Sequence, residues 1–277
     1  MVDAALRGRL KRERRTGDKV VIGDRVSVAP QGEHWVVEEV EERRTEIVRR
    51  GPGGRKPKIV AANLDRVFVV IAASDPDPTL ALVDRLLVVG EASGFSPLLV
   101  VNKVDLDGGG RIAARMQGLY GGIGYQVLPV SATTGVGLDA LGERLSRGVS
   151  ALIGPSGAGK SSLLNALDPS LDLRTGALSR KAKRGRHTTV SSRLLPLSFG
   201  GWVADTPGFG DVGLWGVPPE GVEPCFPEFA DHQDQCRFRG CAHLHEPDCA
   251  VRDAVAGGEI VESRYESYVR LREEALE

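Results

Sequence analysis

Residues 154–162, with the sequence GPSGAGKSS, have the spacing of a loop that binds the phosphates of a nucleoside triphosphate. Glycines let the backbone curl until its N–H groups, together with the N-terminus of the following helix, surround the phosphates. Lys160 would neutralise charge on the β- and γ-phosphates, and the hydroxyl of Ser161 would bind Mg²⁺. A chance glycine-rich loop is the alternative, but the apolar run before the motif and the helix-like SSLLNAL after its lysine are the context it requires. The predicted nucleotide-binding residues are Gly154, Pro155, Ser156, Gly157, Ala158, Gly159, Lys160, Ser161 and Ser162.

Asp205 begins the sequence DTPG, directly after the apolar run Trp202–Ala204. A carboxylate at a strand end can reach the coordination shell of Mg²⁺, and the N–H of Gly208 would then lie near the γ-phosphate. By itself DTPG can be an ordinary tight turn. Beside a phosphate-binding loop it indicates a second part of the same site.

The sequence NKVD follows the apolar run Pro97–Val101 and favours guanine as the base. The carboxylate of Asp105 can accept hydrogen bonds from both N1–H and the N2 amino group of guanine, a pair of donors that adenine lacks. Asn102 would contact the purine edge, the stem of Lys103 would pack on the base, and the backbone at Ser131 and Ala132 would reach guanine O6. NKVD alone could be an accident of a strand end, but Ser131 and Ala132 after the next apolar run favour GTP over ATP. The predicted base-binding residues are Asn102, Lys103, Val104, Asp105, Ser131 and Ala132.

Phe209 follows DTPG at the place where many GTPases have a glutamine that orients the attacking water. A phenyl ring can neither donate nor accept a hydrogen bond, so intrinsic hydrolysis should be slow and a partner should accelerate it. His187, in the basic segment 180–189, is the internal candidate for positioning water, and Thr188 or Thr189 would complete the Mg²⁺ shell. Alternatively, His187 only packs or faces solvent and the partner supplies the group. The catalytic candidates are thus His187, Lys160, Asp205 and Gly208, and the magnesium candidates are Ser161, Thr188, Thr189 and Asp205.

All four cysteines of the chain lie near its C-terminus. In a reducing compartment such clustering favours metal over disulfide. Cys236, Cys241, His243 and Cys249 have the spacing C-x₄-C-x-H-x₅-C, a set able to close a tetrahedral Zn²⁺ site. Free buried cysteines, or a Cys₄ site with Cys225 in place of His243, are alternatives, and spacing does not exclude the nearby His245.

The composition is that of a globular protein, with 41% hydrophobic residues and a formal net charge of −1. Residues 1–60 carry 15 Lys and Arg against 10 Asp and Glu, whereas residues 223–277 carry 6 against 13. The basic N-terminal region is either a solvated face or an electrostatic footprint for nucleic acid. Apolar runs are all far shorter than the ~18–20 residues of a membrane span, and the N-terminus turns basic before an apolar stretch can develop. We therefore expect a cytoplasmic, monomeric protein.

The elements that position these motifs indicate a multidomain protein. Short β-branched runs from Lys19 to Arg50 predict a small β domain, with no convincing strand before Gly17, and the basic break at 51–58 is the domain boundary that composition favours. Apolar strands then alternate with helical patterns, which predicts an α/β domain. The predicted strands are 65–73, 97–101, 126–130, 149–153 and 202–204, and the predicted helices are 80–91, 111–119, 138–145 and 160–167. The predicted domains are 1–61, 62–220 and a zinc-binding module at 221–277.

The motifs resemble those of translation-factor-like GTPases, but in a different order. Ordinary members have the phosphate-binding loop first, whereas here NKVD and Ser131–Ala132 precede it, so the chain reads as a circular permutation. A permutation can preserve the sheet because the motifs act through their places at strand ends. The segment after DTPG is therefore tethered directly to the element that senses the γ-phosphate.

A β domain, a permuted GTPase and a Cys₃His module in this order resemble the ribosome small subunit-dependent GTPase A (RsgA) family. The resemblance rests on NKVD, SA, GPSGAGKSS, GRHTT, DTPGF and the Cys₃His spacing, and it covers nearly the whole chain. It implies an N-terminal OB-fold barrel that contacts ribosomal RNA. Without a convincing strand before Gly17, this barrel would be incomplete. It also implies GTP hydrolysis that accompanies release from the small ribosomal subunit late in maturation. Zinc would be bound by Cys236, Cys241, His243 and Cys249. The rival hypothesis is a zinc-dependent nucleic-acid-binding module with a purely structural nucleotide site.

Overall fold

In the N-terminal part of the chain, the described residues form strands and no helix. The computed structural model describes residues 4–6, 20–50, 57–173, 193–205 and 217–276. Strands β1 (Ala4–Leu6), β3 (His34–Val40) and β2 (Val26–Gln31) form a three-stranded sheet in that order, with β1 parallel to β3. The expectation of no strand before Gly17 is wrong. A three-residue strand is too short to show alternation, and its pairing with β3 defines it.

A second small sheet leads into the next domain. Strands β4 (Glu46–Arg50) and β5 (Pro57–Ala62) pair in antiparallel fashion, with Arg50 opposite Pro57. The basic break at 51–58 therefore overlaps the start of β5, and the strands β4 and β5 on its two sides pair with each other. The predicted domain bounds stay predictions. The region is OB-like in its strand content, and its five described strands pair in two separate sheets.

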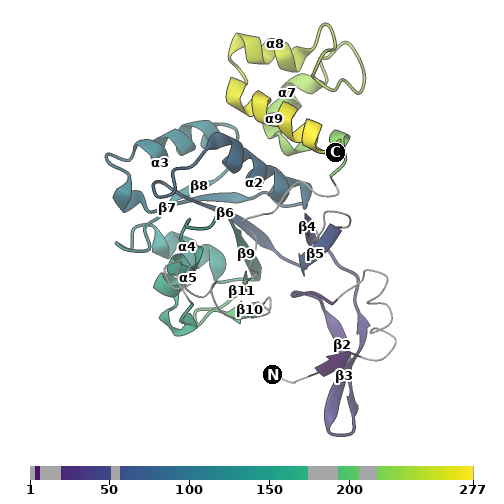
Figure 1. Ribbon diagram of the computed structural model, residues 1–277, viewed down its shortest axis with the longest axis vertical. Coiled ribbons are helices and arrows are strands. Elements are labelled where there is room, and N and C mark those ends of the chain that lie inside the picture. The colour runs from purple at the N-terminus through teal and green to yellow at the C-terminus, as the bar shows by residue number, and fades with distance from the viewer. Residues whose placement is uncertain (1–3, 7–19, 51–56, 174–192, 206–216, 277) are drawn as a thin grey trace, which may run out of the picture.

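The central domain is a six-stranded sheet in the order β10-β11-β9-β6-β7-β8 (Figure 1). Its members are β6 (Arg66–Ala72), β7 (Leu98–Asn102), β8 (Val127–Pro129), β9 (Val149–Ile153), β10 (Arg193–Pro196) and β11 (Trp202–Asp205). All neighbours are parallel except β10 and β11. The five parallel strands match the predicted ones, whereas the edge strand β10 was not predicted.

Helices cover both faces of this sheet, so its inner strands are apolar throughout. Along β6, Val67, Val69 and Ile71 belong to one core cluster and Phe68 and Val70 to another. The first cluster packs against α2 (Leu80–Ala92), α3 (Arg111–Met116) and the π-helical turn Gln117–Gly121. The second packs against α4 (Leu138–Leu145) and α5 (Lys160–Leu167), which is followed by the 3₁₀ turn Pro169–Leu171.

The C-terminal module consists of short turns and three helices. Its elements are the 3₁₀ turns η5 (Pro219–Gly221), η6 (Glu223–Cys225) and η7 (Pro227–Phe229), followed by α7 (Ala230–Gln233), α8 (Ala250–Gly257) and α9 (Glu262–Glu274). Its core contains Phe226, Phe229 and Tyr268, and it includes Val88 of the central domain's α2. The module is therefore packed directly onto α2 (Figure 1). Among the described residues, no helix is long and apolar enough to span a membrane.

A buried polar network fixes this docking. Asp84 of α2 is fully buried and accepts hydrogen bonds from Tyr120 Oη (2.7 Å), Arg264 Nη1 (2.9 Å) and Ser267 Oγ (2.5 Å). Arg264 also donates from Nε and Nη2 to Glu228 at 2.6 and 3.2 Å. A buried charge needs such complete pairing, and here the pairing joins α9 to α2.

Candidate active site and metal centre

The predicted nucleotide-binding motifs meet at one edge of the central sheet. The phosphate-binding loop follows β9, NKVD begins at the last residue of β7, Ser131 lies just beyond β8, and Asp205 ends β11. Carboxyl ends of parallel strands share one edge, which is where open α/β sheets bind ligands. In the sheet order, β11 and β9 lie on one side of β6, and β7 and β8 lie on the other. The phosphate half and the base half are thus side by side, although the chain builds the base half first.

Two glycines allow the backbone of the phosphate-binding loop to pass close to β6 and to Asn102. Gly154 has φ 153°, and a Cβ there would lie 2.0 Å from the carbonyl oxygen of Val70. Gly159 has φ 89°, and a Cβ there would lie 2.3 Å from Nδ2 of Asn102. Gly159 is also the N-cap of α5, so the helix N-terminus with its partial positive charge opens onto the loop.

Lys160 lies inside the loop that it is expected to serve. Its Nζ donates to the carbonyl oxygens of Gly154 (2.7 Å) and Pro155 (3.0 Å). Burial lowers the pKa of Lys160 to about 8, and nearby Asp205 opposes part of this shift. Burial also raises the pKa of Asp205, although Arg193 and Lys160 act against it. A desolvated lysine and a desolvated carboxylate at adjacent strand ends are suited to a phosphate and its metal ion.

Asn102 joins two loops of the nucleotide site, and its predicted contact with the purine edge stays a prediction. It is only 1% exposed; its Nδ2 donates to the carbonyl oxygen of Ala158 at 2.9 Å, and its Oδ1 accepts from the N–H of Ala132 at 3.4 Å. Both ends of its amide are therefore used to join the phosphate-binding loop to the Ser131–Ala132 loop. The motif alone cannot reveal this, because the two partners come from distant segments.

The other base-pocket candidates lie together. Ser131 Oγ donates to Asp105 Oδ1 at 2.6 Å and accepts from the N–H groups of Thr133 and Thr134. This leaves Oδ2 of Asp105 without a hydrogen bond among the described residues. Lys103 has φ 61° and donates from Nζ to the carbonyl oxygen of Asp75. The loop after β6 therefore also shapes this pocket, a contribution that no sequence motif signals.

His187, Thr188, Thr189 and Gly208 lie outside the described residues. Their roles in water positioning, Mg²⁺ coordination and γ-phosphate contact stay predictions.

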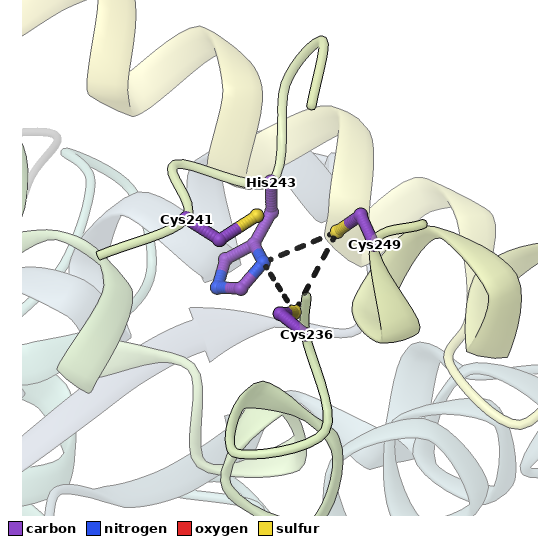
Figure 2. A group of neighbouring side chains, drawn as sticks. All are labelled: Cys236, Cys241, His243 and Cys249. Carbon is purple, nitrogen blue, oxygen red and sulfur yellow. Dashed lines mark hydrogen bonds between the residues drawn. The ribbon is translucent and has the colours of Figure 1, made fainter. Parts of the chain in front are cut away.

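The four predicted zinc ligands converge in the C-terminal module, and their donor atoms all lie within 4.8 Å of one another (Figure 2). Cys236 Sγ is 3.9 Å from Cys249 Sγ and 3.6 Å from His243 Nδ1, which is 3.3 Å from Cys249 Sγ. Tetrahedral Zn²⁺ with bonds of ~2.3 Å to sulfur and ~2.0 Å to nitrogen requires edges of about 3.8 and about 3.5 Å. The three distances among Cys236, His243 and Cys249 fit a tetrahedral zinc ion, and Cys241 Sγ lies within 4.8 Å of these donors as a fourth ligand.

The alternative ligands lie outside this cluster. The thiol of Cys225 is buried among apolar side chains and donates to the carbonyl oxygen of Gly221 at 3.3 Å. His245 is exposed. Helix α9 holds the ligand loop in place, since Tyr265 and Tyr268 donate from Oη to the carbonyl oxygens of His243 (2.6 Å) and Ala242 (2.7 Å).

A doubly covered sheet that presents a phosphate-binding loop and NKVD at one edge, with the base half first in the chain, defines a circularly permuted P-loop GTPase. Residues 40–215 match the family model described as RsgA GTPase. The chain is 48% identical to the small ribosomal subunit biogenesis GTPase RsgA of Gemmatimonas aurantiaca, over 99% of this chain and 90% of that protein. It is 40% identical to the protein of the same name from Thermotoga maritima, over 93% of this chain and 84% of that protein.

Two solved structures also match nearly the whole chain in fold. The crystal structure of YjeQ from Thermotoga maritima superposes with a TM-score of 0.81 at 36% identity, over 99% of this chain and 90% of that one. The crystal structure of YloQ, a circularly permuted GTPase, superposes with a TM-score of 0.73 at 30% identity, over 99% and 86%. This chain belongs to the RsgA GTPase family and is a GTP hydrolase.

Proposed function

We propose that this GTPase acts in the biogenesis of the small ribosomal subunit, which it binds in the GTP state and leaves after hydrolysis. The observation that carries the proposal is the 48% identity, across 99% of the chain, with a relative named for that process. The partners would be the small subunit with its rRNA and GTP or GDP, and we expect a cytoplasmic monomer.

The nucleotide site supports a catalytic rather than a structural role. In our proposal Lys160 neutralises phosphate charge, Asp205 and Ser161 hold the metal shell, and Asp105 selects guanine. Mg²⁺, when bound, neutralises charge that develops on the transferred phosphate. A structural site would not need a lysine and a carboxylate desolvated together at the phosphate end. The rival nucleic-acid-binding module is therefore not favoured.

Two experiments test this function. GTP turnover should be slow alone and faster with purified small subunits, and Lys160→Ala should abolish the stimulation. Co-sedimentation with subunits should be stronger with a non-hydrolysable GTP analogue than with GDP. Equal sedimentation in both states would refute the switch, and stimulation that survives Lys160→Ala would refute the assignment of the catalytic loop.

We also propose that Cys236, Cys241, His243 and Cys249 hold one structural Zn²⁺ ion. The support is the agreement between the donor spacing and a tetrahedral ion, in a module with a small core, where metal binding adds folding free energy. Metal analysis of the purified protein should give one zinc per chain. Cys249→Ser should lose it and Cys225→Ser should keep it, and the reverse result would refute the ligand set.

A further inference from the structure

The imidazole of His243 presents its two nitrogens to different environments. The side chain is only 1% exposed. Its Nδ1 faces the thiols of Cys236 and Cys249. Nε2, on the far side of the ring, is buried and makes no hydrogen bond within the described residues. Its near neighbour is the carboxylate of Glu223, with Oε2 at 3.5 Å. A buried ring nitrogen that makes no hydrogen bond and lies 3.5 Å from a carboxylate oxygen calls for an explanation.

We propose that Glu223 is a positioning residue for the metal centre, and that it accepts a hydrogen bond from Nε2–H of His243 when Nδ1 ligates the ion. A neutral imidazole that binds metal through Nδ1 must carry its proton on Nε2. Metal-binding histidines commonly donate that proton to a carboxylate, which fixes the ring and strengthens the ligand. The inference rests on the metal site proposed above and extends it by one residue.

Other groups near the ring do not supply this acceptor. The rings of Phe229 and Tyr268 lie edge-on or tilted to the imidazole, with centroids 5.9 and 6.3 Å away, and Tyr268 Oη already donates to Ala242. The Glu246 carboxylate accepts from the N–H groups of Ala242, Leu244 and His245. The Glu223 carboxylate makes no hydrogen bond among the described residues, and its side chain is 24% exposed, so a small rotation can close the gap.

Glu223 also connects the metal centre to the central domain. It is the first residue of η6, and both Cys225 of η6 and the N-cap residue Val222 share a core cluster with Val88 of α2. A hydrogen bond from His243 to Glu223 therefore ties the metal-bound loop to the turn that lies on α2. Loading the metal should accordingly stabilise the packing of η6 as well as the ligand loop.

The test is the zinc affinity of the full-length protein, measured by competition with a chromophoric chelator. Glu223→Ala should weaken zinc binding about 10- to 100-fold, the range typical of lost outer-shell partners. Glu223→Gln should lose less, because its amide oxygen still accepts a hydrogen bond. The matched control is Glu220→Gln on η5, an exposed glutamate in the same region, which should bind zinc like the wild type. Co²⁺-substituted Glu223→Ala should keep a tetrahedral absorption spectrum with three sulfurs and one nitrogen.

Two results would overturn the proposal. One is a zinc affinity of Glu223→Ala equal to that of Glu220→Gln. The other is a drop in the free energy of unfolding of the metal-free protein, measured by urea unfolding, that equals the drop in zinc-binding free energy caused by Glu223→Ala. A general packing defect would then explain the weaker binding. A wild-type protein that binds no zinc would instead refute the metal site itself, so the two failures are distinguishable.

Discussion

Replacing Arg264 by methionine tests how the C-terminal module is held on the central domain. Methionine keeps most of the apolar stem but removes the guanidinium of a side chain that is only 3% exposed. Three hydrogen bonds are lost, one to Asp84 and two to Glu228. The contact of the guanidinium with the Phe226 ring, at 4.5 Å from its centroid, is lost as well.

The expected cost follows from what the substitution leaves behind. Asp84 and Glu228, at 0% and 6% side-chain exposure, would be left in the interface without their cation. Removing one partner of a buried ion pair typically costs ~3–5 kcal/mol. The other ion pair between α2 and α9, Arg85 with Glu274, is about one-third exposed and contributes only ~0.2–1 kcal/mol, so it cannot compensate. We therefore expect the opening free energy of α9 to fall by ~4 kcal/mol.

Amide hydrogen exchange measures this opening helix by helix. A loss of ~4 kcal/mol corresponds to about 10³-fold faster exchange in α9, with little change in β6 and β7 because their core is separate. Arg270→Met, an exposed arginine on the same helix, is the control and should change exchange by less than about threefold. If α9 exchanges equally in both variants, the network does not hold the module. If β6 loosens as much as α9, the two domains unfold as one unit and the reasoning about a local interface is wrong.

Three further predictions concern the nucleotide site. Asp105→Asn should shift the nucleotide preference from GTP towards XTP, because one hydrogen-bond acceptor becomes a donor. Competition binding measures this preference, and a variant that still strongly prefers GTP would contradict the assignment of the base pocket. Because the pKa of Lys160 is about 8 in the free site and phosphates favour its charged form, GTP binding should take up a proton above that pH. GTP affinity should then fall as the pH rises through about 8 and be constant at lower pH. Calorimetry in two buffers of different ionisation enthalpy measures the proton uptake. No proton uptake on GTP binding at ~pH 9 would count against the prediction. His187→Ala should lower the subunit-stimulated GTPase rate by about 10²-fold with nucleotide affinity nearly unchanged, and a wild-type stimulated rate would remove His187 from the mechanism.

Local sequence determined the chemistry and most of the central domain. GPSGAGKSS needs only its own glycines and the helix after it to form a phosphate-binding loop, so nine adjacent residues suffice to identify it. Strands such as β6 and β7 were predictable because burial on both faces leaves a continuous apolar run. The permutation was also readable, since motif order is a property of the chain alone.

Tertiary structure decided whatever depends on partners distant in the sequence. The hydrogen bonds of Asn102 to Ala158 and Ala132 join segments far apart in the chain, and strand β1 is defined by its pairing with β3. The spacing of the cysteines left Cys225 and His245 as possible ligands, and only the fold of the module separates them from the cluster. Glu223 and Asp84 carried no signal, because an isolated glutamate or aspartate in a helical or loop sequence is usually solvated. Packing sets which distant residues a side chain contacts, and such contacts leave no periodic pattern in the sequence.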